Sequence, residues 1–225
     1  MRKISNVLRE IYPIDWSKIT TLECGANAEG DETSDLIGIS NCWFMEANPN
    51  DYNTLKQNKK NTINLALSDK NGEVEFNVCP GIGSGLSGID FSEDHLNDLK
   101  IFNLDYKTIV VPCIKYDDLQ KKYDFKIDVL VLDIEGHELR VINSFFNIEE
   151  ELLPKILVIE CGHDWIERKE KLNKLGYVED CYYYNNCYLT KKNTNILKNS
   201  DNIKLFNDQW RHFKWGEKII YINNL

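Results

Sequence analysis

The chain has 225 residues, a hydrophobic content of 42% and a formal net charge of −9 at pH 7, so it can bury one hydrophobic core of good size. The negative charge argues against a nucleic-acid partner, because proteins that bind nucleic acid usually present a basic face. No apolar run approaches the length of a membrane-spanning helix, and the seven cysteines include no Cys-x-x-Cys pair, so we expect no membrane partner, disulfide framework or zinc site.

Apolar periodicity predicts an alternation of strands and helices along the chain. In chain order, the expected elements are a helix at 4–11, a strand at 19–25, a short helix at 31–37, a strand at 42–46, a helix opening at Asn48-Pro49, a strand at 63–67, a hairpin turn at Asn71-Gly72 leading into a strand at 73–78, a helix around 95–99, strands at 108–114 and 128–134, a helix after Gly136, a strand at 155–161, a helix ending at Gly176, and a terminal hairpin about Asn185-Asn186. This alternation predicts the α/β class, as a Rossmann-like three-layer sandwich with a mainly parallel sheet and an antiparallel C-terminal hairpin. We expect a single domain over residues 1–225, made of a helical extension (1–18), the core (19–178), and the terminal hairpin and tail (179–225).

The turn after the first predicted strand, residues 23–30 (ECGANAEG), combines glycines with carboxylates. A glycine turn between a strand and a helix opens many nucleotide-cofactor folds. A pyrophosphate group would be repelled by Glu23 and by the acids within residues 29–32, whereas the sulfonium and ammonium groups of S-adenosylmethionine would be attracted. The sequence therefore favours S-adenosylmethionine over NAD or ATP. Tyr52 and Lys56 match the Tyr-x-x-x-Lys of short-chain dehydrogenases, but they fall on the wrong helix for that chemistry.

Four predicted strands end in an acidic residue: Glu23, Glu46, Asp133 and Glu160. Ligands of open α/β sheets bind beyond the carboxyl ends of the strands, so these acids predict a lined crevice. Glu46 follows Gly25 by about 20 residues, the position from which an acidic side chain accepts the ribose hydroxyls of an adenosine.

Four segments, in this order, resemble the motifs of FkbM-type methyltransferases, which are class I S-adenosylmethionine-dependent enzymes: residues 23–30 (ECGANAEG), 44–49 (FMEANP), 64–69 (NLALSD) and 132–138 (LDIEGHE). The Asp-x-Glu-Gly-x-Glu sequence that begins at Asp133 is the most specific part. The resemblance covers residues 19–178 and implies methyl transfer to a hydroxyl oxygen of a sugar, glycan or polyketide-like small molecule.

By position, the resemblance implies that residues 23–30 surround the methionine part of the cofactor, that Glu46 holds the ribose, and that residues 66–68 border the adenine. The residues that it assigns to the cofactor are Glu23, Gly25, Ala26, Asn27, Gly30, Glu46, Ala47, Ala66, Leu67, Ser68 and Asp133. Two positions depart from the family pattern, because Glu23 stands where Asp is usual and Val131 stands where Lys is frequent.

An alcohol acceptor must lose a proton during methyl transfer, and a well-placed base accelerates such a step by about 10²–10⁴-fold. The candidate catalytic residues are Asp133, His137 and His163. The alternative for both histidines is an ordinary residue near the start of a helix. In a metal-dependent alternative of catechol type, Asp133, Glu160 and His163 would ligate Mg²⁺ or Mn²⁺, which would orient and acidify the acceptor hydroxyl.

Residues 80–90 interleave glycines with serines, a pattern that fits either a connecting loop or a lid over the acceptor site. A non-catalytic alternative for the whole chain is a module that binds S-adenosylmethionine in order to regulate a partner. The N-terminus lacks the pattern of a signal peptide, so we expect a cytoplasmic protein that acts on a small molecule or a glycan. The sequence indicates no particular oligomeric state.

Overall fold

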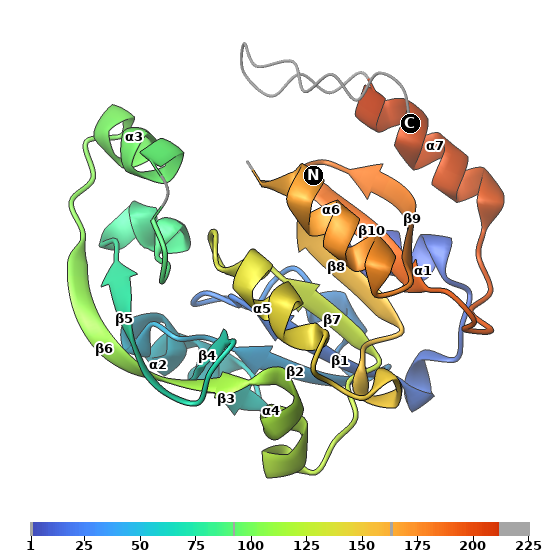
Figure 1. The fold of residues 1–225 in the computed structure, drawn as a ribbon, viewed down its shortest axis with the longest axis horizontal. Coiled ribbons are helices and arrows are strands. Elements are labelled where there is room, and N and C mark those ends of the chain that lie inside the picture. The colour runs from blue at the N-terminus through green and yellow to red at the C-terminus, as the bar shows by residue number, and fades with distance from the viewer. Residues whose placement is uncertain (1, 92, 163, 212–225) are drawn as a thin grey trace.

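The structure is a computed structural model that describes residues 2–91, 93–162 and 164–211. Its main sheet is seven-stranded, with the order β3-β2-β1-β7-β8-β10-β9 (Figure 1). The strands are β1 Thr20–Cys24, β2 Asn41–Met45, β3 Thr62–Ile63, β7 Val129–Leu132, β8 Ile156–Glu160, β9 Tyr177–Tyr183 and β10 Asn186–Lys191. The first five in sheet order run parallel, whereas β10 is antiparallel to both of its neighbours. The predicted α/β class, the mainly parallel sheet and the antiparallel C-terminal hairpin are confirmed.

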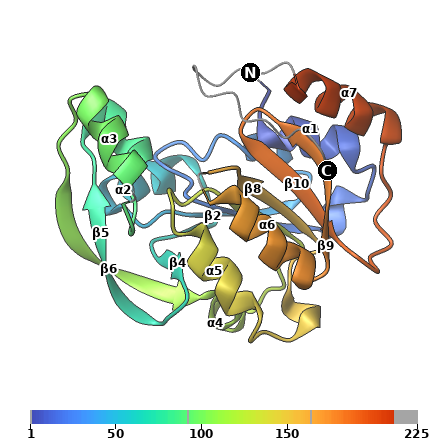
Figure 2. The same ribbon diagram turned by 45° about the horizontal axis from the view of Figure 1, so that its top comes forward.

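Helices cover both faces of the main sheet, as the two views in Figures 1 and 2 show. One face carries α4 Tyr116–Tyr123, α5 Glu138–Phe145 and α6 Trp165–Lys174, and the other carries α1 Ile4–Ile11, α2 Pro49–Asn58 and α7 Ser200–Arg211. Each face has its own buried apolar cluster: Leu130 and Leu132 of β7 belong to the first, and Val129 and Val131 to the second. The strand β7 is thus buried on both sides, as its continuous apolar run predicts. In the described parts of the chain, no helix combines the length and apolar character needed to cross a lipid bilayer.

The sequence around Asn48 and Pro49 determines where α2 begins. The side chain of Asn48 accepts a hydrogen bond from the backbone N–H of Asn50 at 3.1 Å, and Pro49 occupies the first helical position. Both are standard signals for a helix N-terminus. The helix therefore begins directly after the end of β2, where Glu46 lies.

A second, three-stranded sheet stands beside the main sheet and forms an arm of the molecule, which we define as residues 66–115 (Figure 1). It contains β4 Ala66–Ser68, β5 Gly72–Val78 and β6 Lys107–Lys115, together with the short 3-10 helix η3 Gly81–Leu86 and the helix α3 Glu93–Ile101. β6 lies between the other two strands, parallel to β4 and antiparallel to β5. A small apolar cluster that includes Ala66, Phe76 and Val111 holds this sheet together.

The expected strand over residues 63–67 is wrong. The segment divides into β3 of the main sheet and β4 of the arm. The side-chain amide of Asn64 donates hydrogen bonds to the carbonyl oxygens of Glu46 (2.8 Å) and Ala47 (3.3 Å). These bonds tie the chain to the end of β2 at the break and lead it from one sheet into the other.

Two further local expectations are wrong. At the expected hairpin turn, the side-chain oxygen of Asn71 accepts a hydrogen bond from the backbone N–H of Lys115 (2.9 Å), and β5 pairs with β6 rather than with β4. The expected helix over 31–37 is reduced to the 3-10 turn η2 Ser34–Leu36. Thr33, directly before this turn, donates its backbone N–H to the carboxylate of Glu23 (2.9 Å).

Candidate functional site

A cavity of about 510 Å³ lies beyond the carboxyl ends of β1, β2 and β7, within the size range of about 300–1,000 Å³ that is usual for small-molecule sites. Its wall is formed by residues 23–32, 45–47, 65–67, Phe76, residues 84, 85, 87 and 89, and residues 133–135. The predicted cofactor residues that line it are Glu23, Gly25, Ala26, Asn27, Gly30, Glu46, Ala47, Ala66, Leu67 and Asp133. Ser68, which was expected beside the adenine, does not line the cavity and is fully buried.

The glycine turn after β1 brings bare backbone to the cavity wall. Gly25 has a φ of +80°, and a Cβ built there would lie 1.6 Å from the carbonyl oxygen of Asp133. Only glycine fits this conformation and this close approach. The backbone N–H groups of Gly25 and Ala26 both donate to the carbonyl oxygen of Met45, at 3.0 and 3.1 Å, so the turn is fixed against the end of β2.

Glu46 lies between the turn after β1 and the start of α2. Its two carboxylate oxygens accept hydrogen bonds from the backbone N–H groups of Asn27 (2.8 Å) and Asn48 (2.7 Å). Burial raises the pKa of Glu46 to about 7. The two backbone N–H groups thus orient the Glu46 side chain. Each carboxylate oxygen has a further lone pair, so Glu46 can still accept a hydrogen bond from a ligand hydroxyl.

Glu23 is held by Thr33, the residue directly before η2. One of its carboxylate oxygens accepts hydrogen bonds from the backbone N–H (2.9 Å) and the hydroxyl (2.6 Å) of Thr33. Burial raises the pKa of Glu23 to about 7. Thr33 is a site residue that sequence reasoning missed, because nothing local links it to a glutamate ten positions earlier.

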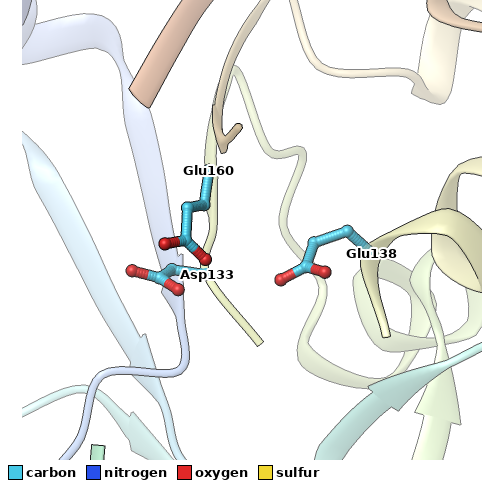
Figure 3. A group of neighbouring side chains, drawn as sticks. All are labelled: Asp133, Glu138 and Glu160. Carbon is cyan, nitrogen blue, oxygen red and sulfur yellow. The ribbon is translucent and has the colours of Figure 1, made fainter. Parts of the chain in front are cut away.

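Three carboxylates meet at the ends of β7 and β8, where each of Asp133, Glu138 and Glu160 has an oxygen within 4.8 Å of the others (Figure 3). In Figure 3 the Glu160 carboxylate lies against that of Asp133, and Glu138 faces the pair from the start of α5. The pKa of Asp133 is raised well above its usual range, first by burial and then by the negative charge of Glu160. A raised pKa makes the ionised form of Asp133 a stronger proton acceptor than an isolated carboxylate.

Glu138 is held by two backbone hydrogen bonds and one buried ion pair. It accepts from the backbone N–H groups of Ile134 (2.8 Å) and Gly136 (3.0 Å) and forms a buried ion pair with Arg168 (2.9 Å). It therefore fixes the turn after β7 that carries Asp133. Sequence reasoning missed its partner Arg168, because Arg168 belongs to a run of basic residues in α6 that has the pattern of a solvent-exposed helix face.

The predicted catalytic residues are not all brought together. Asp133 lines the cavity. His137 does not, and its side chain is buried between Ser68 and Asp90, with ring nitrogens 3.0 and 2.8 Å from their oxygens. His163 lies outside the described residues.

Of the three ligands expected for the alternative metal site, the structure describes Asp133 and Glu160. Asp133 and Glu160 lie close together, and Glu138 completes the described cluster. Carboxylate oxygens are the donors that Mg²⁺ and Mn²⁺ prefer. The donor set thus fits a hard divalent cation, although Glu138 already carries three hydrogen-bonding or ionic partners.

The glycine- and serine-containing segment lies along the cavity. Ser84, Gly85, Ser87 and Ile89 contribute to the wall, and the hydroxyl of Ser84 is 3.4 Å from the side-chain oxygen of Asn27 in the turn after β1. The segment is therefore part of the cavity wall, whether it serves as a connecting loop or as a lid.

Comparison with known proteins identifies a matching protein family. The model described as the methyltransferase FkbM domain matches residues 23–186. A search of curated proteins found no match. Among solved structures, the chain is similar to the precorrin-6y C5,15-methyltransferase of Geobacter metallireducens GS-15, at 13% sequence identity and a TM-score of 0.41, over 83% of this chain and 85% of that chain.

Proposed function

We propose, because the chain belongs to the methyltransferase FkbM domain family, that it transfers a methyl group from S-adenosylmethionine to a hydroxyl oxygen of a small molecule or glycan. S-adenosylmethionine is the cofactor expected for this family. The observation that carries the choice of oxygen is Asp133, a carboxyl group with a raised pKa in the wall of the cavity. A hydroxyl acceptor needs such a proton acceptor, whereas a sulfur or an uncharged amine acceptor has less need of one.

The residues present fit this cofactor. The glycine turn at Gly25 packs directly against the backbone of Asp133, so the turns after β1 and β7 form one continuous part of the cavity wall. The acids Glu29, Asp31 and Glu32 line the cavity and suit a cation rather than a phosphate. Glu46 would hold the ribose, because its carboxylate is oriented by two backbone N–H groups at the end of β2.

When bound, the cofactor supplies a methyl group on a positively charged sulfur, and its transfer to oxygen leaves a neutral thioether. Asp133 would accept the proton that the acceptor hydroxyl releases as the new carbon–oxygen bond forms. Glu160 would share that proton, since its carboxylate lies beside that of Asp133 and two such neighbours titrate as a pair. Glu138 and Arg168 would keep the turn that carries Asp133 in place.

The test begins with calorimetric titration of S-adenosylhomocysteine, with NAD as the comparison ligand. We expect S-adenosylhomocysteine to bind and NAD not to bind. Incubation with S-adenosylmethionine and a panel of polyols, glycans and amines should then give methyl ethers. Binding of NAD alone would contradict the cofactor, and methylated amines without ethers would contradict the acceptor atom. Binding without turnover on any acceptor would favour the non-catalytic module.

A second candidate mechanism uses a divalent metal at Asp133 and Glu160. It is favoured by the neighbouring carboxylates of Asp133 and Glu160, a pair that is costly unless a proton or a cation neutralises it. The third carboxylate, Glu138, is already paired with Arg168. In that mechanism the metal would orient and acidify the acceptor hydroxyl. Activity lost to a chelator and restored by Mg²⁺ or Mn²⁺ would support it.

A further inference from the structure

A chain of hydrogen bonds links three elements beside the cavity. The hydroxyl of Ser68 in β4 lies 3.0 Å from Nε2 of His137, and Nδ1 of His137 lies 2.8 Å from a carboxylate oxygen of Asp90. His137 stands directly before α5, and Asp90 follows η3 in the arm. Asp90 also forms an ion pair with Nε of Arg140 at 2.8 Å.

This order of serine, histidine and aspartate matches that of a hydrolase triad, but burial excludes that role. Ser68 is 0% exposed and His137 is 2% exposed, so no substrate reaches the serine hydroxyl. Since a carboxylate only accepts hydrogen bonds, Nδ1 of His137 must carry the proton in its bond to Asp90. The histidine thus serves as a connector that joins Asp90 to β4.

The segment that ends at Asp90 is fixed at its base and contributes to the wall of the cavity. At the base, the backbones of Asn77 and Gly88 exchange hydrogen bonds of 2.8 and 3.1 Å, and Cys79 N–H donates to the hydroxyl of Ser87 at 3.0 Å. Farther along, Ser84 meets the turn after β1. Ser84, Gly85, Ser87 and Ile89 supply part of the cavity wall.

The same segment packs closely against the turn after β7. A Cβ built on Gly88 would lie 2.8 Å from the carbonyl oxygen of Glu135, and a Cβ on Gly136 would lie 3.1 Å from the carbonyl oxygen of Asp90. The two backbones are therefore near enough that a larger residue at either glycine would push them apart. The bond between Asp90 and His137 lies at this contact.

We propose that Asp90 and His137 form a clasp that holds residues 81–90 closed over the cofactor cavity. His137 is then a positioning residue, which acts through Asp90, and not a catalytic residue that touches the acceptor. The clasp rests on the proposed function, because it takes the cavity to be the cofactor site. Its consequence is that cofactor and acceptor are retained by a segment whose closure depends on the contacts that Asp90 makes with His137 and with Arg140 of α5.

The first experiment compares Asp90→Ala with Asp105→Ala, a matched change at an exposed aspartate in the loop between α3 and β6 of the same arm. In the free protein, we expect hydrogen exchange of residues 81–90 to be faster in Asp90→Ala and unchanged in Asp105→Ala. With S-adenosylhomocysteine, we expect Asp90→Ala to raise the dissociation rate and the Kd by about three- to tenfold, the range for loss of one hydrogen bond. Asp105→Ala should match the wild type.

A second experiment separates positioning from catalysis. His137→Asn keeps an N–H donor near the place of Nδ1 and should restore most of the slow exchange, whereas His137→Ala should behave as Asp90→Ala or be less stable. We expect KM for cofactor and acceptor to rise more than kcat falls in both Asp90→Ala and His137→Ala. A large loss of kcat in His137→Asn, with an unchanged Kd for S-adenosylhomocysteine, would assign His137 to catalysis and overturn the clasp.

The two proposals fail in different ways. If the wild type does not bind S-adenosylhomocysteine, the proposed function is contradicted, while the exchange comparison in the free protein still tests the contact between Asp90 and His137. If the wild type binds the ligand and Asp90→Ala shows the same Kd, dissociation rate and hydrogen exchange, the clasp alone is overturned.

Discussion

Gly25 and Asp133 meet through their backbones: a Cβ at position 25 would lie 1.6 Å from the carbonyl oxygen of Asp133. The contact follows from the sheet, in which β1 and β7 are neighbours with Cys24 opposite Leu132. The backbone N–H of Asp133 also donates to the carbonyl oxygen of Cys24 at 3.2 Å. Two motifs that lie far apart in the sequence thus form one wall of the cavity, and neither can shift without the other.

The first prediction concerns this contact. Gly25→Ala should lower the free energy of unfolding by about 3 kcal/mol or more, because it combines a left-handed backbone conformation with a clash against a carbonyl oxygen. Gly38→Ala is the matched control, since Gly38 has a similar φ of +85° but open space around its Cβ position. That control should cost only about 1 kcal/mol. Urea unfolding of both variants checks the difference, and equal losses would show that the turn relaxes.

The second prediction concerns Glu46. Glu46→Gln replaces one of the two acceptor oxygens with a donor that faces the backbone N–H of Asn27 or Asn48. We expect affinity for S-adenosylhomocysteine to fall by about 1.5–3 kcal/mol, the range for a hydrogen bond to a charged group. Calorimetry should be run beside Glu75→Gln, a change at an exposed glutamate in β5. Unchanged affinity in a folded Glu46→Gln protein would show that the ribose lies elsewhere.

Much of this site was predictable because the ends of buried parallel strands must meet at one edge of the sheet. The acids Glu23, Glu46 and Asp133 follow such strands, and all three line the cavity. Their positions depend only on where each strand ends, which apolar runs indicate well. The terminal hairpin was predictable for a similar reason, because its turn residues and its strand pattern lie close together in the sequence.

What the sequence did not reveal depends on partners that are distant along the chain. A histidine beside an acidic motif has the pattern of a catalytic residue, yet His137 is buried between Ser68 and Asp90. Likewise, Asn71-Gly72 has the local form of a hairpin turn, but Asn71 binds the backbone of Lys115. Local propensity decides that a strand or turn forms, whereas the choice of pairing partner is made by the whole fold.

The third prediction is a pH dependence of stability that comes from Glu23 and Glu46. Burial raises the pKa of each from 4.5 to about 7. Between these values the folded protein holds more protons than the unfolded chain, so the free energy of unfolding falls as pH rises through this window. Each group contributes on the order of 3 kcal/mol. This contribution is present below pH 4.5 and lost above about pH 7.

Urea unfolding from pH 5 to pH 8 measures this effect, with the Glu23→Gln and Glu46→Gln variants as references. As pH rises, the wild type should lose stability relative to each variant. The buried glutamate must ionise in the folded wild type at an unfavourable site, whereas the glutamine of the variant stays neutral. A difference that stays constant across the range would show that both carboxylates are ionised in the folded protein throughout.

The fourth prediction concerns Asp133 as the proton acceptor. Asp133→Asn should lower turnover by about 10²–10⁴-fold, the contribution of a well-placed base, with little change in affinity for S-adenosylhomocysteine. Loss of kcat at constant binding is the sign of an interaction made in the transition state. Asp35→Asn is the control, since Asp35 lies in η2 and does not line the cavity.

Glu160→Gln and a chelator distinguish the two ways in which Asp133 would act. If Asp133 and Glu160 share a proton, removal of the Glu160 charge should lower the pKa of Asp133, because that charge is one of the causes of its elevation. The acidic limb of the pH–rate profile should then move to lower pH, and a chelator should have no effect. If they share a metal, Glu160→Gln should weaken the response to added Mg²⁺ or Mn²⁺, and a chelator should abolish turnover. Full turnover of Asp133→Asn on the true acceptor would exclude both mechanisms. The cavity would then accelerate methyl transfer by positioning the two reactants alone, which lowers the activation free energy by on the order of 7–11 kcal/mol in favourable cases.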